Sequence, residues 1–273
     1  MKVAVIVLLT IIVAVCVTAS VGYVASQDLD CETLVFSTNK KVSLKIAHIS
    51  DLHFPFNGVE LTEILDAVKS VNPDVIALTG DMLDDDGDKE DVISLGKFFA
   101  ALAKIARCYL VIGNHEIGSP LLDYFIEVTA ESGVIALDNK AEFVPVEGGR
   151  LAVIGLSDAY PYDKRVKNWA QIRESDLKIL LAHRPELVED YASVTDDKKP
   201  DFIFSGHAHG GLLRMGKLAF YAPNQGVFPK YTSGAYVKNG STMIVSRGLG
   251  ISGVDYRFFN KYHIPIVEIK AAE

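Results

Sequence analysis

Clusters of positive charge are missing from this sequence. Its 273 residues include 27 lysines and arginines against 35 aspartates and glutamates, so the formal net charge is −8. An acidic chain without a run of lysine or arginine lacks the electrostatic footprint of a nucleic-acid-binding protein, and we expect no nucleic-acid partner. Internal repeats and low-complexity tracts are also missing, and nothing in the sequence indicates a protein partner.

Cysteine is scarce, with three in the chain. Cys16 lies in an apolar segment and follows Val15, which is too bulky for a good lipoprotein-processing site. Cys31 and Cys108 could pair in an oxidising compartment, but Cys108 opens a buried-looking strand, where a free thiol is the expected state. The cysteines therefore indicate little about function.

Charged residues are absent between Val3 and Val24. Because about 20 apolar residues span a bilayer, residues 1–26 are predicted to form a single-pass N-terminal membrane anchor. A cleaved signal peptide is the alternative, since the small residues Ala25 and Ser26 suit a peptidase site. Lys2 precedes the segment and acidic residues follow it, so the positive-inside tendency predicts that the main domain lies outside the cytoplasm.

The rest of the chain alternates short apolar runs with amphipathic stretches. After a polar connector, residues 27–41, we expect one domain over residues 42–273. Strands are predicted at Leu44–Ser50, Val75–Thr79, Cys108–Ile112, Leu151–Gly155, Ile179–Ala182 and Phe202–Ser205. Helices are predicted at Leu61–Val71, Ile93–Ala106, Leu121–Ser132 and Glu186–Ser193. Beyond Leu218 only short strands follow. This alternation predicts an α/β fold with a mostly parallel sheet.

Polar side chains follow five of the predicted strands, at the point where each strand ends. In an open α/β sheet the carboxyl ends of parallel strands open onto the ligand crevice, so these side chains are expected to meet. In chain order they are Asp51, His53, Asp81, Asn114, His115, Glu116, His183, His207 and His209. Each motif alone is weak evidence for a functional site, but the occurrence of all of them at strand ends is strong evidence.

Three carboxylate or amide groups and four imidazoles, with no thiolate, suit Zn, Mn or Fe better than Ca or Mg. Such a set is too large for one tetrahedral site that keeps an open position. It fits two divalent metal ions that share a bridging carboxylate and a bridging water or hydroxide. His207 and His209 alternate along what we expect to be extended backbone, so both rings should face one side.

These motifs, in this order, resemble the calcineurin-like metallophosphoesterases over roughly residues 45–210. The quoted motifs are Asp51-Leu52-His53, Gly80-Asp81, Gly113-Asn114-His115-Glu116, His183 and Gly206-His207-Ala208-His209. The chain looks most like the membrane-associated bacterial phosphodiesterase branch, which includes UDP-diacylglucosamine pyrophosphatases. The resemblance implies a β-sandwich flanked by helices (α/β/β/α). Ala208 and Leu212 depart from the residues common in the family, which leaves the substrate subgroup open.

The resemblance also implies roles for individual residues. Asp51, His53 and His209 would hold the first metal, with Asp81 bridging; Asn114, His183 and His207 would complete the second. His115 would be the catalytic imidazole that protonates the leaving oxygen, with Glu116 as its orienting partner.

These observations predict a membrane-tethered hydrolase that uses a metal-bridging hydroxide on phosphodiester or diphosphate bonds, with lipid-linked substrates included. Arg247 is a candidate substrate contact, since a guanidinium matches phosphate oxygens, and Arg257 is a weaker one; a structural arginine is the alternative for both. Asp84-Asp85-Asp86 is predicted to be a solvated acidic loop, because Lys89 stands where a calcium loop needs glycine. The alternatives are a nucleotide or cyclic-nucleotide phosphodiesterase, a phosphoprotein phosphatase and a non-catalytic binding module.

Overall fold

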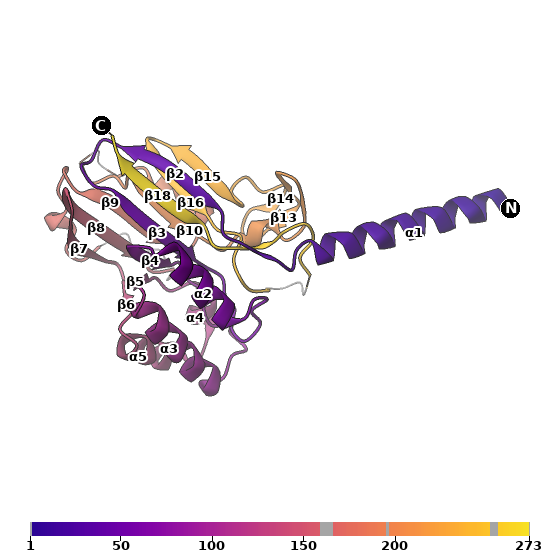
Figure 1. Cartoon of the computed structure of the whole chain (residues 1–273), viewed down its shortest axis with the longest axis horizontal. Helices are drawn as coiled ribbons and strands as arrows, with labels where there is room; N and C mark the ends of the chain where they lie inside the picture. Colours follow the sequence, from indigo (N-terminus) through magenta and orange to yellow (C-terminus); the bar gives the residue numbers. More distant parts are fainter. Residues whose placement is uncertain (1, 159–165, 195–196, 252–255, 273) are drawn as a thin grey trace.

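Helix α1 (Lys2–Val24) projects away from the rest of the chain (Figure 1). The computed structural model describes residues 2–158, 166–194, 197–251 and 256–272. Helix α1 is long and apolar enough to cross a membrane, and its most apolar window is not buried against the domain. By length and composition, α1 is therefore a candidate transmembrane span.

Two six-stranded sheets stack face to face. The first contains, in spatial order, β2 (Thr33–Thr38), β18 (Ile266–Ala271), β3 (Leu44–Ile49), β4 (Val75–Leu78), β5 (Arg107–Leu110) and β6 (Ile135–Ala136). The second contains β15 (Gly234–Lys238), β16 (Ser241–Val245), β10 (Phe202–Ser205), β9 (Leu177–Ala182), β8 (Gly149–Leu156) and β7 (Lys140–Val146). Both sheets are mixed, but β3 to β6 are parallel to one another, as are β8, β9, β10 and β16. The parallel strands therefore point their carboxyl ends in common directions.

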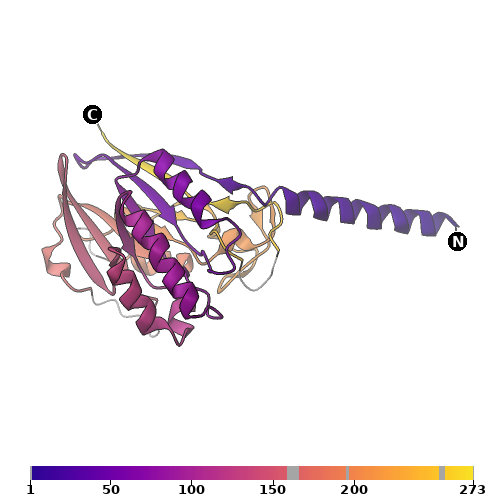
Figure 2. The same cartoon turned by 60° about the horizontal axis from the view of Figure 1, so that its bottom comes forward.

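Three small two-stranded sheets lie outside this sandwich. They pair β1 (Leu29–Asp30) with β17 (Tyr262–His263), β11 (Arg214–Met215) with β12 (Leu218–Ala219), and β13 (Tyr221–Ala222) with β14 (Gly226–Val227). The last two pairs are antiparallel hairpins. Figures 1 and 2 both place β13 and β14, or the orange segment that contains them, at the end of the domain from which α1 leaves.

The longer helices of the domain cover the outer face of the first sheet (Figure 2). They are α2 (Leu61–Val71), α3 (Lys89–Ala103) and α5 (Leu122–Glu131). Only short helices accompany the second sheet in the described part of the chain: η1 (Trp169–Gln171), η2 (Pro185–Leu187) and α6 (Val188–Tyr191). The remaining two, α4 (Asn114–Gly118) and η3 (His209–Gly211), begin where polar side chains leave the strands.

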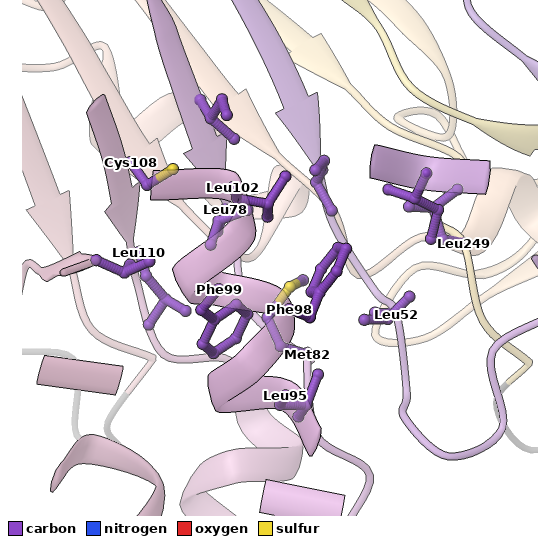
Figure 3. Packing of buried hydrophobic residues seen from close by; sticks show 14 of the residues in the cluster. Leu52, Leu78, Met82, Leu95, Phe98, Phe99, Leu102, Cys108, Leu110 and Leu249 are labelled. Atoms are coloured by element: carbon purple, nitrogen blue, oxygen red, sulfur yellow. The ribbon is translucent and has the colours of Figure 1, made fainter. Parts of the chain in front are cut away.

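Alternating side chains from the strands fill three apolar layers. One face of the first sheet packs on the helices, as Figure 3 shows for Phe99 and Leu102 of α3 near Leu78 and Leu110. The opposite face packs against the second sheet, and the outer face of the second sheet packs on α6. This order of layers is the predicted helix-flanked sandwich. Cys108 lies in the first layer as a free thiol, and burial raises its pKa to about 12.

Each predicted strand and helix overlaps an element of the structure, but β6 and β7 of the two large sheets were not predicted, and two further differences have a clear physical reason. Helix α3 begins at Lys89 rather than Ile93, because the Asp88 side chain accepts hydrogen bonds from the backbone N–H of Glu90 and Asp91 and caps the first turn. Residues 27–41, expected as a connector, contain β1 and β2, and β2 pairs in parallel with β18. As an edge strand with alternating exposure, β2 lacks the apolar run that marks a central strand.

Candidate metal centre

The two sheets bring seven of the predicted site residues to one end of the sandwich. Strands β3, β4 and β5 of the first sheet lead into Asp51, His53, Asp81 and Asn114. Strands β9 and β10 of the second sheet lead into His183, His207 and His209. The seven residues are Asp51, His53, Asp81, Asn114, His183, His207 and His209. All but Asn114, which is partly buried, are buried, so polar atoms are concentrated where water is scarce.

The first group of potential ligands consists of Asp51, His53 and His209. The Nε2 atoms of His53 and His209 face each other at 3.2 Å, and the Asp51 Oδ1 atom lies 3.6 Å from the latter. At most one hydrogen can lie between two facing imidazole nitrogens, and the Asp51 Oδ2 atom is buried without a hydrogen-bond partner. Lone pairs therefore converge here, as a metal site requires.

The second group consists of Asp81, His183 and His207, with Asn114 beside them. The His183 Nε2 atom lies 3.0 Å from Asp81 Oδ2, 3.1 Å from His207 Nδ1 and 3.2 Å from Asn114 Oδ1. One nitrogen thus has three oxygen or nitrogen neighbours at nearly equal distance. This group could also hold a metal ion.

Asp81 lies between the two groups. Its Oδ2 atom is 3.0 Å from His183 Nε2 in the second group and 3.8 Å from His53 Nε2 in the first. A carboxylate in this position can bind one ion on each side. The donors of both groups are imidazole nitrogens and carboxylate or amide oxygens, without a thiolate, which suits Mn, Zn or Fe. The residues present therefore fit a pair of divalent ions.

Three histidines are oriented by a hydrogen bond at the ring nitrogen that faces away from the group. The His183 Nδ1 atom is 2.7 Å from the Thr79 carbonyl oxygen, and the His53 Nδ1 atom is 2.9 Å from Asp84 Oδ2. The Asn224 side-chain amide lies 3.3 Å from His207 Nε2. The acceptors at Nδ1 of His183 and His53 select the tautomer that leaves Nε2 free for a metal, whereas the Asn224 amide only orients the His207 ring.

The backbone around these ligands is unusual. Asp51, His53, Asp81, His207 and His209 all have positive φ angles, between 46° and 62°. Non-glycine residues rarely adopt this conformation, and it concentrates at functional sites. The expectation of an extended backbone at His207 and His209 is therefore wrong: the sharp turn sends the two rings into different groups.

Two glycines allow the backbone to approach the carboxylates closely. A Cβ atom on Gly113 would lie 2.2 Å from Asp81 Oδ1, and one on Gly206 would lie 2.2 Å from Asp51 Oδ2. Both distances are far below van der Waals contact, so any side chain would displace a potential metal ligand.

Burial and charge set the protonation of the imidazoles. Burial and the nearby His183 lower the pKa of His207 to about 2, so His207 is neutral and able to coordinate. Burial also lowers the pKa of His209 well below its usual value. Burial opposes the charged form of His183 as well, but the Asp81 carboxylate outweighs it and raises the pKa of His183 to about 10. A cation at the second group would replace this proton.

His115 lies at the edge of the first group, with its ring edge-on to His53 at 4.4 Å between centroids. Its backbone N–H donates to Asp81 Oδ1 at 2.9 Å, and its Nδ1 atom contacts Asp85 Oδ1 and lies 3.5 Å from Asp84 Oδ2. The Asp84–Asp86 segment is therefore not merely a solvated acidic loop, since two of its carboxylates contact histidines of the site.

The His115 ring has Asp85 rather than Glu116 as its hydrogen-bond partner, so the expected role of Glu116 as the orienting partner is wrong. The buried Glu116 carboxylate instead accepts hydrogen bonds from the backbone N–H groups of Asp81, Met82, Leu83 and Gly113. Four donors on one carboxylate tie the segment after β4 to the segment after β5. Side chains three positions apart share one face of a helix, but this spacing in α4 did not indicate which backbone groups Glu116 would contact.

Arg247 pairs with Asp30 of β1, with 2.6 Å between Nη2 and Oδ2. Its Nε atom also donates to the Lys261 carbonyl oxygen at 3.2 Å. Arg257 is buried and donates to the carbonyl oxygens of Arg247 and Gly250, and burial lowers its pKa to about 10. Arg257 is therefore a structural arginine, whereas a substrate contact by Arg247 stays a prediction.

Comparisons with known proteins agree with this geometry. The family model described as Calcineurin-like phosphoesterase matches residues 44–211, a region that contains all seven potential ligands. The chain is 29% identical over 240 residues to "Uncharacterized metallophosphoesterase YkoQ" of Bacillus subtilis, covering 83% of each chain. It is 27% identical over 191 residues to "Phosphodiesterase YaeI" of Escherichia coli, covering 67% of this chain and 66% of YaeI. It is 25% identical over 266 residues to "Transmembrane protein with metallophosphoesterase domain" of Danio rerio, covering 91% of this chain and 57% of that protein.

Proposed function

Since the matching model spans more than half of its residues, the chain belongs to the calcineurin-like phosphoesterase family, and we propose that it is a membrane-tethered, two-metal hydrolase of phosphodiester or diphosphate bonds. The position of Asp81 carries the proposal. Its carboxylate lies within 3.8 Å of a histidine from each group, and both groups supply imidazole and carboxylate donors. One shared carboxylate between two such groups is the arrangement that a binuclear hydrolase uses.

Two divalent cations, when bound there, polarise the phosphoryl oxygens and make a water molecule acidic enough to attack at neutral pH. The side chains of the protein supply negative charge, orientation of the imidazoles and a proton. Asp81 and Asp51 offset the positive charge, and the hydrogen bonds to His53 and His183 hold those rings in place. In the imidazolium form of His115, Nδ1 donates to Asp84 and Asp85 while Nε2 holds the proton that the leaving oxygen takes up, which returns the ring to its neutral form.

The name of the relative YaeI supports a diester rather than a monoester substrate. The apolar helix α1 supports the tether, as does the name of the Danio rerio relative. A tether keeps the site near the membrane, where lipid-linked phosphodiesters and diphosphates are concentrated, and we include these in the substrate class. The charge around α1 favours a domain on the extracytoplasmic side.

The test uses the full chain in detergent micelles, stripped of metal and resupplied with Mn²⁺, Zn²⁺ or Fe²⁺. Hydrolysis of bis-p-nitrophenyl phosphate is compared with that of p-nitrophenyl phosphate, with and without chelator. We expect metal-dependent turnover that prefers the diester. Asp81→Asn should lose turnover and bind less metal, whereas Asp86→Asn, an exposed neighbour in the same segment, should lose neither.

Any other result of this test would contradict a stated part of the proposal. Metal-dependent turnover that prefers the monoester contradicts the diester proposal and favours a phosphatase. Two bound metals without turnover of either compound or of a lipid diphosphate contradict the hydrolase and favour a binding module. Failure to bind metal would contradict the metal centre itself.

A further inference from the structure

The segment after η3, which forms two hairpins, exposes six large apolar side chains. We call residues 212–230, which include β11 to β14, the hairpin surface. Its exposed apolar residues are Leu213, Met215, Leu218, Tyr221, Val227 and Phe228. Met215, Val227 and Phe228 are each more than 60% exposed. Apolar side chains gathered in this way mark a surface that contacts something other than water.

The charge of the hairpin surface is the reverse of that of the whole chain. No aspartate or glutamate occurs in the sequence between Asp201 and Asp255, although the chain has 35 acidic residues. The hairpin surface itself carries Arg214, Lys217 and Lys230. Among the described residues, no carboxylate lies within ion-pair distance of Arg214 or Lys217; Lys217 is exposed, whereas the half-buried Arg214 donates to the Gly210 carbonyl oxygen and to Thr232 Oγ1. The surface therefore combines apolar side chains with uncompensated positive charge.

The hairpin surface is connected directly to the base of α1. The backbone N–H of Phe259 donates to the Gly22 carbonyl oxygen at 3.0 Å, and the Phe258 ring fills the space that a side chain at Gly22 would need. Phe258 in turn bridges to Leu213, and the backbone N–H of Arg214 donates to its carbonyl oxygen at 3.0 Å. The candidate membrane span and the hairpin surface are thus held together through residues 258–259. Figures 1 and 2 place them at the same end of the domain.

We propose that the hairpin surface lies in the headgroup region of an anionic phospholipid bilayer, beside the point where α1 enters it. Aromatic and aliphatic side chains interleaved with lysine and arginine are typical of segments that bind at the bilayer interface. A second copy of this chain fits less well, because residues 258–259 hold the hairpin surface against the base of α1, where the bilayer itself would lie. The proposal rests on the membrane tether in the proposed function but not on phosphoesterase activity.

Docking in this position would set where substrate enters. The turn between β13 and β14 carries Asn224, whose side-chain amide lies 3.3 Å from His207 Nε2. One hairpin therefore contacts a potential metal ligand and also exposes Tyr221 and Val227. A domain resting on this surface opens its metal centre beside the headgroups, where a lipid-borne phosphodiester or diphosphate lies.

The test measures contact with lipid by tryptophan quenching. Trp169 is the one tryptophan of the chain, so Trp169→Phe provides a background into which Val227→Trp is introduced. The full chain is reconstituted in nanodiscs of phosphatidylcholine and phosphatidylglycerol whose acyl chains carry bromine. The matched control is Val237→Trp, on β15, since Val227 and Val237 are 69% and 76% exposed. Val237 lies toward the end of β15 that pairs with the start of β16, away from the metal centre.

We expect bromine to quench Val227→Trp and to leave Val237→Trp unquenched. Equal fluorescence of the two variants in brominated and plain nanodiscs would overturn the proposal. If the full chain in micelles were a dimer that Val227→Glu dissociated, and quenching were absent, the surface would be a contact between copies instead. These readouts do not involve hydrolysis, so failure of the proposed activity leaves them interpretable.

The contribution of charge is tested separately. Lys217→Glu in the Val227→Trp background should reduce quenching in nanodiscs that contain phosphatidylglycerol, and Lys97→Glu, an exposed lysine on α3, should not. Quenching that is the same with and without phosphatidylglycerol would overturn the preference for anionic lipid. If the activity is also present, Val227→Glu should slow hydrolysis of a lipid-borne diester and leave that of bis-p-nitrophenyl phosphate unchanged, in contrast to Val237→Glu, which should change neither.

Discussion

Replacement of Glu116 by glutamine should disturb the metal centre without removing any ligand. Each Glu116 oxygen accepts from two backbone N–H groups: Oε1 from Met82 and Leu83, and Oε2 from Asp81 and Gly113. Glutamine keeps the shape but turns one oxygen into an NH₂ group, which cannot accept. Whichever way the amide points, two buried N–H groups lose their acceptor.

The size of the effect follows from these contacts. A hydrogen bond to a charged group contributes about 1.5–3 kcal/mol, so two lost bonds cost about 3–6 kcal/mol. Burial and the charge of Asp81 raise the pKa of Glu116, which means that a neutral side chain relieves part of this unfavourable burial. We therefore expect Glu116→Gln to lower the free energy of unfolding by about 2–4 kcal/mol. Because a ligand displaced by about 1 Å can cost about 10²-fold in rate, we also expect slower hydrolysis.

The assay is urea unfolding of the full chain in micelles, followed by circular dichroism, together with hydrogen exchange of the Asp81–Leu83 amides. Glu127→Gln, an exposed glutamate on α5, is the matched control and should behave as the unaltered chain does. Unfolding of Glu116→Gln at the same urea concentration as the control, with the same amide protection, would contradict this role of the Glu116 carboxylate. Loss of protection over the whole domain would instead indicate a general loss of structure.

Further predictions concern single positions of the site. His115→Ala should keep its metal content and lose about 10²–10⁴-fold in kcat on a diester with an alkyl leaving group, but less with p-nitrophenolate, which needs no proton; equal losses on both would contradict the proton-donor role. Gly206→Ala places a Cβ atom 2.2 Å from Asp51 Oδ2, so we expect about 10²-fold slower hydrolysis and weaker metal binding, measured by kinetics and metal analysis. Arg247→Ala breaks the ion pair with Asp30 and should lower the free energy of unfolding by about 1–3 kcal/mol; a simultaneous rise in KM would add the substrate contact. Because the pKa of His183 is raised to about 10, this ring is protonated at neutral pH in the metal-free chain, so metal binding should release a proton and tighten as pH rises; calorimetry in buffers of different ionisation enthalpy measures that proton.

The sequence predicted most of the sandwich because burial leaves a strong local pattern. β4, β9 and β10 are buried along their whole length, and β4, β10 and the part of β9 after Lys178 appear in the sequence as apolar runs that stop at a polar residue. Strand β2 gave no such signal, since its side chains alternate between exposed and half-buried positions beside β18. An edge strand is defined by its partner, which lies more than two hundred residues away in the chain.

Some residues of the site can likewise be predicted from local sequence patterns, whereas others depend on contacts between distant parts of the chain. Residues at strand ends could be collected from the sequence, because the end of each strand is a local feature. The contacts of Asp84 and Asp85 with His53 and His115 could not, since they depend on how the loop after β4 folds over the end of β3. Glu116 stood in the predicted motif, but its true contacts lie with another strand end.

The turn at His207 and His209 shows why spacing alone misleads. Two histidines separated by one residue share a face only on extended backbone, and here both φ angles are positive, at 62° and 46°. The resulting turn gives each group one imidazole from the same strand end, so three consecutive residues connect the two halves of the centre. The same turn leads directly into the hairpin surface, and the Asn224 side chain returns from that surface to His207. Movement of the hairpins would therefore change the position of His207 in the second group of ligands. A bilayer that immobilised the hairpins would also keep this side of the metal centre in its binding geometry.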